Sequence, residues 1–517
     1  MSDPSLDQHE NFLRYTSGRW LWDEEQQLRD RFTPFNVLEL QHIAARSVGA
    51  NKCVAMTKLA EGSFNRTFRL TMDNGSAAIA RISHPIAGPK YYTTASEVAT
   101  MDFISFSPST VARTVLRIPV PHVHAWSAHV DNPVGAEYII MEEASGTKLE
   151  DVWDKLPLED RIAIMKNLVL IENKLLSVSF SNYGNLYYSS EPISSATAAE
   201  VVNDTSPEIK SEVKRRFYIG PVVDRDFWSK ERSVMNIDRG PWKLCQDYVV
   251  ALAHHELEWI KRYAVPKSAD DPLVISAAQN SPGAHISLLQ KYLQVAPYLL
   301  PTDPDIVAPT IWHTDLHSGN LFVDKGRHPR LVDHHGDIIL KPPENFKDLE
   351  PNEKVRLRKQ IASSIVLYLY EQQTAKINPR LDQVLRLKLG RVRCDPISFA
   401  SNTWDDDILP LRESLINLER HWHELGFDFA CPIHFTEEEL QAHAKDGEGW
   451  NEVQDFWRAV EGIVTRDGWT PHDLYDDAIA LFSELREIGL KSMVEKDRKD
   501  FKAQTQWVEK FPSQKPK

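Results

Sequence analysis

The sequence predicts a two-lobed α+β fold, in which a small antiparallel β lobe is followed by a large, mainly helical lobe. Residues 58–83 alternate polar and apolar side chains and are rich in β-branched and aromatic residues, which is typical of paired strands. From residue 159 onward, apolar side chains recur at helical spacing instead. A chain of 517 residues is long enough for several domains of ~150 residues each. The predicted segments are an N-terminal extension (1–50), the small lobe (51–145), the large lobe with an insertion (146–345) and a helical C-terminal part of that lobe (346–517).

Each segment of the small lobe has its own pattern. An Asn-Gly pair inside residues 58–83 predicts a tight turn that joins two antiparallel strands. Residues 93–105 are expected to be helical, whereas the prolines of residues 118–129 exclude a helix there. Residues 136–146 are predicted to form a buried strand that runs into a polar hinge ending in glycine.

The large lobe is expected to be mostly helical. Residues 159–177 place apolar side chains four, three and four residues apart, which is the stripe of a helix that faces a core. Residues 186–250 carry proline and glycine turns without a clear period, so we expect an irregular insertion. Beyond residue 350, helix patterns dominate. The stripe consists of Ile164, Leu168, Ile171 and Leu175.

Composition narrows the classes of partner and site. Asp and Glu total 74 against 60 Lys and Arg, a formal net charge of −14, which argues against a nucleic-acid partner because such proteins neutralise phosphates with a basic surface. The 4 cysteines are far apart, so neither a disulfide scaffold nor a cysteine zinc site is expected. No apolar run reaches the ~18 residues of a membrane span. The acidic start has no signal or transit-peptide pattern, which taken alone predicts a cytoplasmic protein.

One stretch, IWHTDLHSGNLFVD, carries the strongest functional pattern. Asp315 and Asn320 follow His313 on a predicted turn, and an apolar triplet comes next. A second turn and a second apolar triplet lead to Asp333, so the segment after Asn320 is expected to form a hairpin. Because the two ends of a hairpin lie side by side, the side chains of Asn320 and Asp333 are predicted to converge, with Asp315 one loop away.

These residue types suit a magnesium-assisted phosphoryl transfer. Mg²⁺ prefers carboxylate and carbonyl oxygens and usually shares its ligand shell with substrate phosphates. The transfer also needs an acidic residue that orients the attacking hydroxyl and accepts its proton. We therefore assign Asn320 and Asp333 to the metal and Asp315 to the proton. His313 is expected to orient the loop by hydrogen bonding rather than to act on substrate.

The pattern H-x-D-x-x-x-x-N at residues 313–320 resembles the catalytic loop of the aminoglycoside phosphotransferase and choline kinase group, which shares the protein-kinase-like fold. Further stretches are similar to fungal phosphotransferase-family proteins, including the altered-inheritance-of-mitochondria group: EGSFNRTFRL, IARI, SEVATM, EYIIMEEASGTKLEDVW, RFYIGP, RGPW and CDPISFASNTWDDDILPLRESL. The likeness covers most of the chain. It implies a bilobal kinase-like protein that uses ATP and Mg²⁺ to phosphorylate a hydroxyl of a small molecule.

Carried over position by position, the resemblance implies a nucleotide site in the small lobe. Gly62 and Ser63 lie where a loop covers the phosphates. Arg81 takes the place of the strand lysine that pairs with phosphate, and Glu97 is implied as its helix partner. The hinge strand, whose backbone groups meet the adenine, is implied at Met141, Glu142 and Glu143.

Two departures from the family pattern leave alternatives open. Arginine clamps phosphate in a bidentate way but is not equivalent to the lysine that it replaces at position 81. Asp333 is followed by His334 and His335 rather than by the family's Trp-Gln. One alternative is therefore a pseudokinase that binds nucleotide or a partner without transfer. A minor alternative is a metal-dependent phosphoesterase, because Asp-His-His after an apolar strand resembles the signature of manganese-dependent phosphoesterases.

Two charged clusters have structural interpretations. The run His254–Glu256 lacks the second histidine of an H-E-x-x-H zinc helix, so a partly exposed helix face is expected. The run Asp405–Asp407 is expected to cap a helix, although the C-terminal helices of similar kinases often line the acceptor pocket.

The resemblance implies a mitochondrial location, in competition with the cytoplasmic expectation above. The expected partners are a nucleotide and a small-molecule acceptor.

Overall fold

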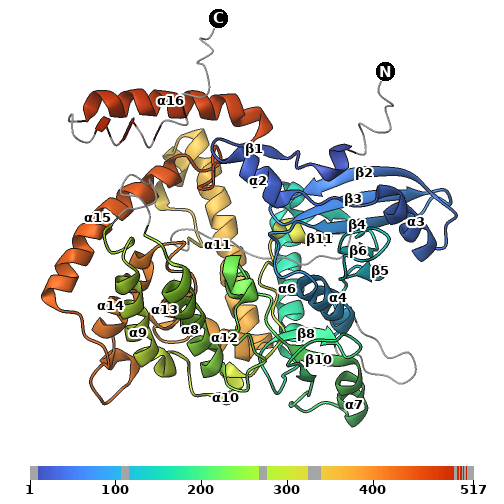
Figure 1. The fold of residues 1–517 in the computed structure, drawn as a ribbon, viewed down its shortest axis with the longest axis horizontal. Coiled ribbons are helices and arrows are strands. Elements are labelled where there is room, and N and C mark those ends of the chain that lie inside the picture. The colour runs from blue at the N-terminus through green and yellow to red at the C-terminus, as the bar shows by residue number, and fades with distance from the viewer. Residues whose placement is uncertain are drawn as a thin grey trace, which may run out of the picture.

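The structure, a computed structural model, describes residues 10–105, 116–266, 276–323 and 339–493, and some residues between 498 and 508. It has two lobes (Figure 1): a sheet-containing lobe near the N-terminus and a larger helical lobe that follows it in the chain. This arrangement confirms the predicted bilobal, protein-kinase-like α+β fold.

The small lobe is built on a five-stranded antiparallel sheet with the strand order β2-β3-β4-β6-β5. Alternate residues of β3 are buried, because one face of the sheet packs on a hydrophobic core. Phe68 and Leu70 lie on that core face and are fully buried. The strands are β2 (Cys53–Glu61), β3 (Asn65–Met72), β4 (Ala77–Ser83), β5 (Val123–Ser127) and β6 (Tyr138–Met141).

The first part of this sheet contains one turn more than the sequence predicted. The expected Asn-Gly turn joins β3 to β4, where Gly75 has a φ of 84° and donates its amide hydrogen bond to the Met72 carbonyl at 3.1 Å. A second turn at Gly62 separates β2 from β3, so residues 58–83 contain parts of three strands rather than two. The prediction was wrong on this point because the alternation of polar and apolar residues continues through the second turn.

Helices α3 and α4 pack on the sheet. α3 (Val37–Ser47) contributes the buried Leu40 and Ala44 to the core under the sheet. α4 (Tyr92–Ser105) contacts β5 and β6, and its bounds confirm the helix predicted over 93–105. The N-terminal residues that form α3 therefore belong to the core of the small lobe.

The first long helix of the large lobe follows the predicted stripe. α6 (Leu158–Leu176) buries every residue of the stripe except Ile171, which is half-buried. A neighbouring side of α6 packs on α11 (Pro351–Ile377), with Val366 buried between the two helices. Helix α11 thus supports α6 from the C-terminal part of the chain.

The predicted irregular insertion at residues 186–250 also contains regular elements that the sequence did not predict. A second sheet with the order β8-β10-β9 and the helix α7 (Pro207–Arg216) lie between residues 185 and 220, whereas residues 221–244 have only short 3-10 turns. Apolar residues of this sheet share a core with α4, so it lies directly against the small lobe's helix. Strands this short show no period in a sequence. They are β8 (Asn185–Tyr188), β9 (Thr197–Ala198) and β10 (Phe217–Gly220).

A bundle of helices fills the centre of the large lobe. Helices α8 and α9 pack on each other, and α13 and α14 complete a common core that buries Tyr292 and Trp422. In the part of the chain that the structure describes, no helix combines the length and apolar character needed to cross a bilayer. The bundle helices are α8 (Cys245–Tyr263), α9 (Pro282–Leu299), α13 (Gly390–Phe399) and α14 (Ile408–Arg420). The large lobe also has the short helices α5 (Leu149–Val152), α10 (Pro304–Val307) and α12 (Pro379–Leu385).

A buried ion pair joins a 3-10 turn at Lys230–Val234 to helix α8 of this bundle. The side chains of Arg232 and Glu256 have no exposed surface and form an ion pair. The Glu256 carboxylate also accepts hydrogen bonds from the Trp404 amide at 3.0 Å and the Thr403 hydroxyl at 3.2 Å. Burial raises the pKa of Glu256, and the positive charge of Arg232 opposes that shift. The prediction of a partly exposed helix face was wrong for His255 and Glu256, because α8 is buried on that side as well.

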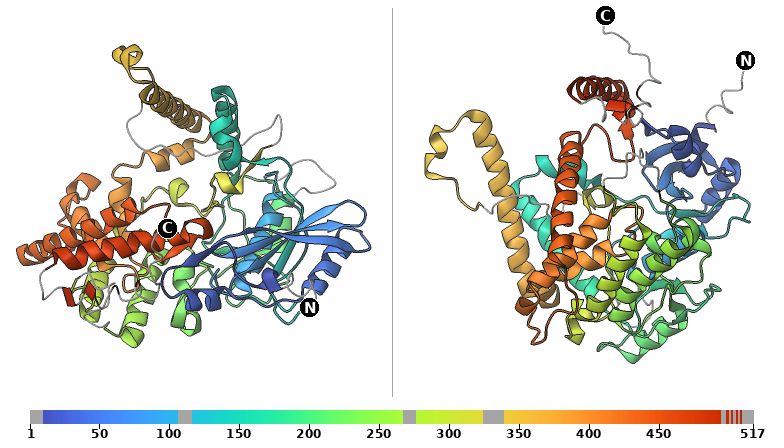
Figure 2. Two further views of the ribbon diagram at one scale, coloured as in Figure 1. Left: turned by 90° about the horizontal axis from the view of Figure 1, so that it is seen from above. Right: turned by 60° about the vertical axis from the view of Figure 1, so that its left-hand side comes forward.

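The C-terminal arm returns to the small lobe. Strand β12 (Trp469–Pro471) pairs antiparallel with β1 (Gly18–Trp20), which is followed by α2 (Glu24–Arg31). The Trp20 indole donates a hydrogen bond to the Asp467 carboxylate at 3.1 Å. Figures 1 and 2 show α16 close to β1, near the start of the described chain. The helices of the arm are α15 (Glu437–Ala459) and α16 (Tyr475–Ser492).

Glu172 is a buried carboxyl group at the contact between α6 and α11. Its residue is 1% exposed, and the Tyr370 hydroxyl donates a hydrogen bond to it at 3.1 Å. Burial raises the pKa of Glu172 to about 7, and the hydrogen bond from Tyr370 opposes this shift. The folded protein therefore holds this proton more tightly than the unfolded chain does. As a result, the free energy of unfolding falls as the pH rises from 4.5 to about 7, and the loss is complete above that range.

Glu172→Gln is expected to raise the free energy of unfolding at pH 8, because the amide needs no proton to be neutral. A shift of this size corresponds to at most about 3 kcal/mol. The difference from wild type is expected to shrink towards pH 5. Urea melts at the two pH values measure it, with the exposed Glu484→Gln as the control. An equal gain at both pH values would contradict the titration.

Candidate functional site

The loop that contains His313 lies beside the connection between the two lobes. Strand β11 (Phe322–Val323), which follows the loop, pairs antiparallel with β7 (Thr147–Lys148), which follows the hinge. Figure 1 shows β11 at the junction of the small lobe and the helical lobe. Within the loop, Ser318–Asn320 form a single 3-10 turn. The chain therefore delivers the loop to the place where the lobes meet.

Asp315 and Asn320 contact each other in this loop. The Asn320 side-chain amide donates hydrogen bonds to the Asp315 carboxylate at 2.8 Å and to the Asp315 backbone carbonyl at 3.0 Å. The Asp315 side chain is 73% exposed, so an incoming hydroxyl has access to its carboxylate. Because the nitrogen of the Asn320 amide is used within the loop, its oxygen is left for another ligand.

Two histidines support the loop. The Asp315 amide donates a hydrogen bond to His313 Nδ1 at 3.2 Å, a contact of the kind expected for an orienting residue. His317 Nδ1 accepts from the Gly319 amide at 3.0 Å, and its Nε2 is 3.7 Å from the Asp315 carboxylate. A Cβ on Gly319 would lie 2.6 Å from the His317 ring, so a larger residue there would require the ring to move. His317 was not assigned to the phosphotransferase site, although its place inside the motif was a usable signal.

The predicted metal partner of Asn320 lies outside the described residues. Asp333, His334 and His335 fall within 324–338, so the predicted hairpin and the convergence of Asn320 with Asp333 stay predictions. Among the residues with a described placement, no group of three or more His, Cys, Asp or Glu side chains is arranged to hold a metal ion. What the described loop offers to a cation is the oxygen of Asn320 and the carboxylate of Asp315.

The ion pair that the resemblance implies for the small lobe is present. Arg81 on β4 pairs with Glu97 on α4, with side-chain exposures of 19% and 33%. The pair joins the helix to the central strand of the sheet. A guanidinium has five N–H donors, so Arg81 retains donors for a phosphate group while it is paired.

The turn between β2 and β3 carries Gly62 and Ser63, which are both exposed. The Gly62 amide donates to the Asn65 carbonyl at 3.0 Å and closes the turn. A Cβ built on Gly62 would meet no atom within 4 Å. The packing of the protein therefore does not require glycine here, which leaves room for a requirement set by a ligand.

Glu61 anchors the start of that turn. Its side chain is fully buried and accepts hydrogen bonds from the Thr16 amide at 2.6 Å and the Lys58 ammonium group at 3.1 Å. The Thr16 carbonyl in turn lies 3.0 Å from His472 Nε2, next to β12. The turn is thus connected through the N-terminal segment to the C-terminal arm. Sequence reasoning missed Glu61, because nothing in its local pattern distinguishes it from an exposed acid at a strand end.

The same turn touches the large lobe. The guanidinium of Arg225 lies 4.5 Å from the centre of the Phe64 ring, a cation–π contact. Phe64 follows Ser63 directly, and Arg225 belongs to a 3-10 turn of the large lobe. The contact bridges the two lobes at the tip of the turn. Neither residue was predicted to be part of the site.

Some polar groups of the hinge segment are already used in contacts within the protein. Met141 ends β6, and the Glu142 amide donates to the His122 carbonyl at 2.8 Å. The Glu143 carboxylate pairs with Arg69 at 2.6 Å. The Glu142 amide is therefore already used within the protein and is not free to donate to an adenine.

The acidic run Asp405–Asp407 lies at the start of α14. Asp407 caps the helix by accepting a hydrogen bond from the Leu409 amide at 2.8 Å, as the sequence predicted. Burial raises the pKa of Asp406, and the charge of Asp226 adds to that shift.

No model of a known protein family matches the chain. A subtelomeric hrmA-associated cluster protein of Aspergillus fumigatus is 30% identical over 494 residues, which cover 84% of this chain and 92% of that protein. Altered inheritance of mitochondria protein 9, mitochondrial, of Yarrowia lipolytica is 27% identical over 524 residues, which cover 92% of this chain and 86% of that protein.

Among solved structures, one from Ralstonia eutropha assigned as an aminoglycoside phosphotransferase has a TM-score of 0.34 and 14% identity, and covers 81% of this chain and 99% of its own. Because this TM-score is low, we assign the fold from the chain's own lobes and strand order and not from its likeness to this structure. The identity and coverage shared with the Aspergillus protein do show the family. The chain belongs to a family of fungal proteins with a protein-kinase-like fold that includes the altered inheritance of mitochondria protein 9 group.

Proposed function

We propose that the chain is an ATP- and Mg²⁺-dependent phosphotransferase that acts on a hydroxyl group of a small molecule. The observation that supports this most is the ion pair between Arg81 on β4 and Glu97 on α4. In protein kinases, a cation on the strand must pair with a glutamate on the helix before the phosphates are correctly held. The pair here joins a sheet strand to the helix that packs on the sheet, as that arrangement requires.

In the proposed reaction, Asp315 orients the acceptor hydroxyl and takes its proton as the oxygen attacks the γ-phosphorus. The bond between this phosphorus and the β–γ bridging oxygen breaks, so the products are a phosphate monoester and ADP. The 2.8 Å hydrogen bond from Asn320 keeps the Asp315 carboxylate in position. His313 supports the loop through the Asp315 amide.

The donor chemistry of the loop fits magnesium. Asn320 uses its amide nitrogen within the loop, which leaves an oxygen of the type that Mg²⁺ prefers. We assign the ion to Asn320 and Asp333; when bound, it neutralises charge on the β- and γ-phosphates. Arg81 is proposed to bind phosphate, and Gly62 and Ser63 are proposed to cover the phosphates with backbone amides.

The proposed partners are a nucleotide and a small-molecule hydroxyl compound, without a nucleic acid. The net charge of −14 disfavours a nucleic-acid partner. The relatives in Yarrowia lipolytica and Saccharomyces cerevisiae are named as mitochondrial proteins. On that likeness we propose a mitochondrial location for this chain.

A thermal-shift panel with ATP and GTP, each with and without Mg²⁺, tests the proposal, followed by an acceptor screen that detects ADP. We expect ATP to raise Tm only when Mg²⁺ is present, and one class of acceptor to release ADP. Stabilisation by nucleotide without turnover for any acceptor would favour the pseudokinase alternative. Absence of any nucleotide effect would contradict both.

Gly62→Val is expected to weaken ATP binding roughly tenfold, or ~1.4 kcal/mol, while the fold is kept. A Cβ at this position meets no protein atom within 4 Å, so we expect a loss of affinity to report on the bound phosphates rather than on packing. Isothermal titration with ATP and Mg²⁺ measures the affinity, and the melting temperature checks the fold. Gly447→Val on α15 is the matched control, since a Cβ there also meets open space. Unchanged affinity in a folded Gly62→Val protein would contradict the phosphate-loop assignment.

A further inference from the structure

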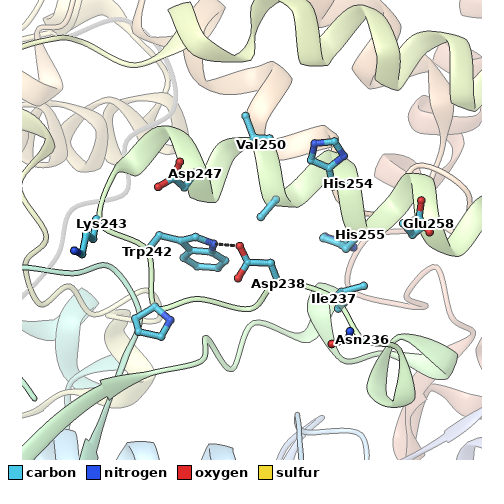
Figure 3. A pocket seen from close by; sticks show the side chains of 12 residues that line it. Asn236, Ile237, Asp238, Trp242, Lys243, Asp247, Val250, His254, His255 and Glu258 are labelled. Atoms are coloured by element: carbon cyan, nitrogen blue, oxygen red, sulfur yellow. Dashed lines mark hydrogen bonds between the residues drawn. The ribbon is translucent and has the colours of Figure 1, made fainter. Parts of the chain in front are cut away.

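A pocket lies in the large lobe, between α8 and the segment that leads into this helix. Its volume is about 580 Å³, which falls in the range of ~300–1,000 Å³ typical of small-molecule sites. None of the residues predicted for the phosphotransferase site lines it. Figure 3 shows Trp242 and Asp238 beside α8, with Asp247 and Lys243 towards one end of the pocket and Glu258 towards the other.

The apolar wall of this pocket is formed in advance. The Trp242 indole donates a hydrogen bond to the Asp238 carboxylate at 2.8 Å. The backbone of Trp242 exchanges two hydrogen bonds with Tyr183, at 2.7 and 2.9 Å. Opposite, α8 contributes Val250 and Ala251 to the lining. A ligand that enters does not have to order these groups, which favours affinity.

His255 supplies an unused hydrogen-bonding group at the pocket. The residue is 2% exposed and lines the pocket, and neither of its ring nitrogens has a hydrogen-bond partner in the described structure. Burial lowers the pKa of His255 to about 3, with Arg232 adding to the shift, so the ring is neutral and has one donor and one acceptor. A buried polar group without a partner is unfavourable, so a ligand that pairs with it gains affinity. A ligand hydroxyl that reaches the ring can pair with one of these nitrogens.

The charges at the rim select against anions. Asp238, Asp247 and Glu258 face the pocket together with Lys243. Glu258 is already paired with Lys261 at 3.2 Å, and Asp238 accepts from Trp242, but no ion pair of the described residues involves Asp247. A carboxylate or phosphate would meet an excess of negative charge, whereas an ammonium group can pair with Asp247.

We propose that this pocket is an accessory binding site for a small organic amine that also carries a hydroxyl group. The ammonium group pairs with Asp247, the apolar body lies against Trp242 and Val250, and the hydroxyl group exchanges a hydrogen bond with His255. The site does not depend on the phosphotransferase assignment, because it shares no residue with the histidine loop, the β2–β3 turn or the hinge.

Isothermal titration of the full chain with three probes of one shape tests this site. Tyramine carries the ammonium group, 4-ethylphenol has no charge, and 3-(4-hydroxyphenyl)propionate carries a carboxylate. We expect tyramine to bind at least tenfold more tightly than the carboxylate. Asp247→Asn is expected to reduce the affinity for tyramine about tenfold and to leave 4-ethylphenol unchanged. Asp247 is exposed, so this variant is expected to fold.

Val250→Trp is expected to fill the pocket and remove the binding of tyramine. Val234→Trp is the matched control, since Val234 is 83% exposed and does not line the pocket. If Val250→Trp does not fold, the Asp247→Asn comparison decides. Failure of tyramine to bind at millimolar concentration, equal binding of the carboxylate, or full binding by a folded Val250→Trp protein would each overturn the proposal.

Discussion

Asp315→Ala is expected to lower the rate of phosphoryl transfer by about 10²–10⁴-fold, the usual contribution of a general base. Nucleotide binding is expected to persist, because the proposed metal and phosphate ligands are other residues. The Asp315 side chain is 73% exposed and contacts Asn320 and His317. Its removal therefore leaves no buried group without a partner, and the fold is expected to be kept.

The measurement for Asp315→Ala is the initial rate of ADP release with the acceptor identified by screening, together with the affinity for ATP in Mg²⁺. Asp348→Ala is the matched control, since Asp348 is an exposed acid on another part of the large lobe. Equal rates in the Asp315→Ala and wild-type proteins would remove Asp315 from the mechanism. Loss of ATP binding together with transfer would assign Asp315 to the metal instead.

Arg232→Ala is expected to lower the free energy of unfolding by about 3–5 kcal/mol. The substitution leaves the Glu256 carboxylate without its ion pair, although the side chain has no exposed surface. The hydrogen bonds from Trp404 and Thr403 then have to support a buried negative charge alone. Protonation of Glu256 relieves part of this cost, so the loss is expected to be larger at pH 8 than at pH 5.

Urea denaturation at both pH values measures the effect of Arg232→Ala. The double variant Arg232→Met/Glu256→Leu is expected to recover much of the lost stability, because it removes the orphaned charge. Arg386→Ala breaks an exposed ion pair with Asp382 and is expected to leave the unfolding midpoint unchanged. A small and pH-independent effect of Arg232→Ala would show that the pair is not the main polar contact of the core.

The small lobe was predictable where the pattern is local. Alternation along β3 and the Asn-Gly turn before β4 follow from a sheet with one buried face. The prediction that Arg81 pairs with Glu97 had a different basis, which was the order of motifs in a known family. Neither residue is distinctive by itself, since a strand arginine and a helix-surface acid are both common.

The second sheet and the C-terminal arm were not predictable in the same way. The strands of the second sheet have between two and four residues, too few to establish a period. The pairing of β1 with β12 joins opposite ends of the chain, and no local pattern carries such information. The burial of Glu256 was unpredictable for a similar reason, because its partner Arg232 lies in a segment whose sequence has no helical period.

The candidate site shows the same division. The contacts among Asp315, His317 and Asn320 join residues that are close in sequence, and a single turn brings them together. The contacts that hold the β2–β3 turn join residues that are far apart in sequence. Glu61 accepts a hydrogen bond from Thr16, which in turn lies beside His472. Only the folded chain reveals that the C-terminal arm reaches the turn that carries Gly62 and Ser63.

In the proposed function, ATP binds between the β2–β3 turn and the loop that contains His313, through a magnesium ion. Isothermal titration of ATP into the full chain, first in Mg²⁺ and then in EDTA, measures this binding. We expect a single site whose affinity falls strongly when the metal is withdrawn. Absence of binding heat in both conditions, or equal affinity with and without Mg²⁺, would contradict it.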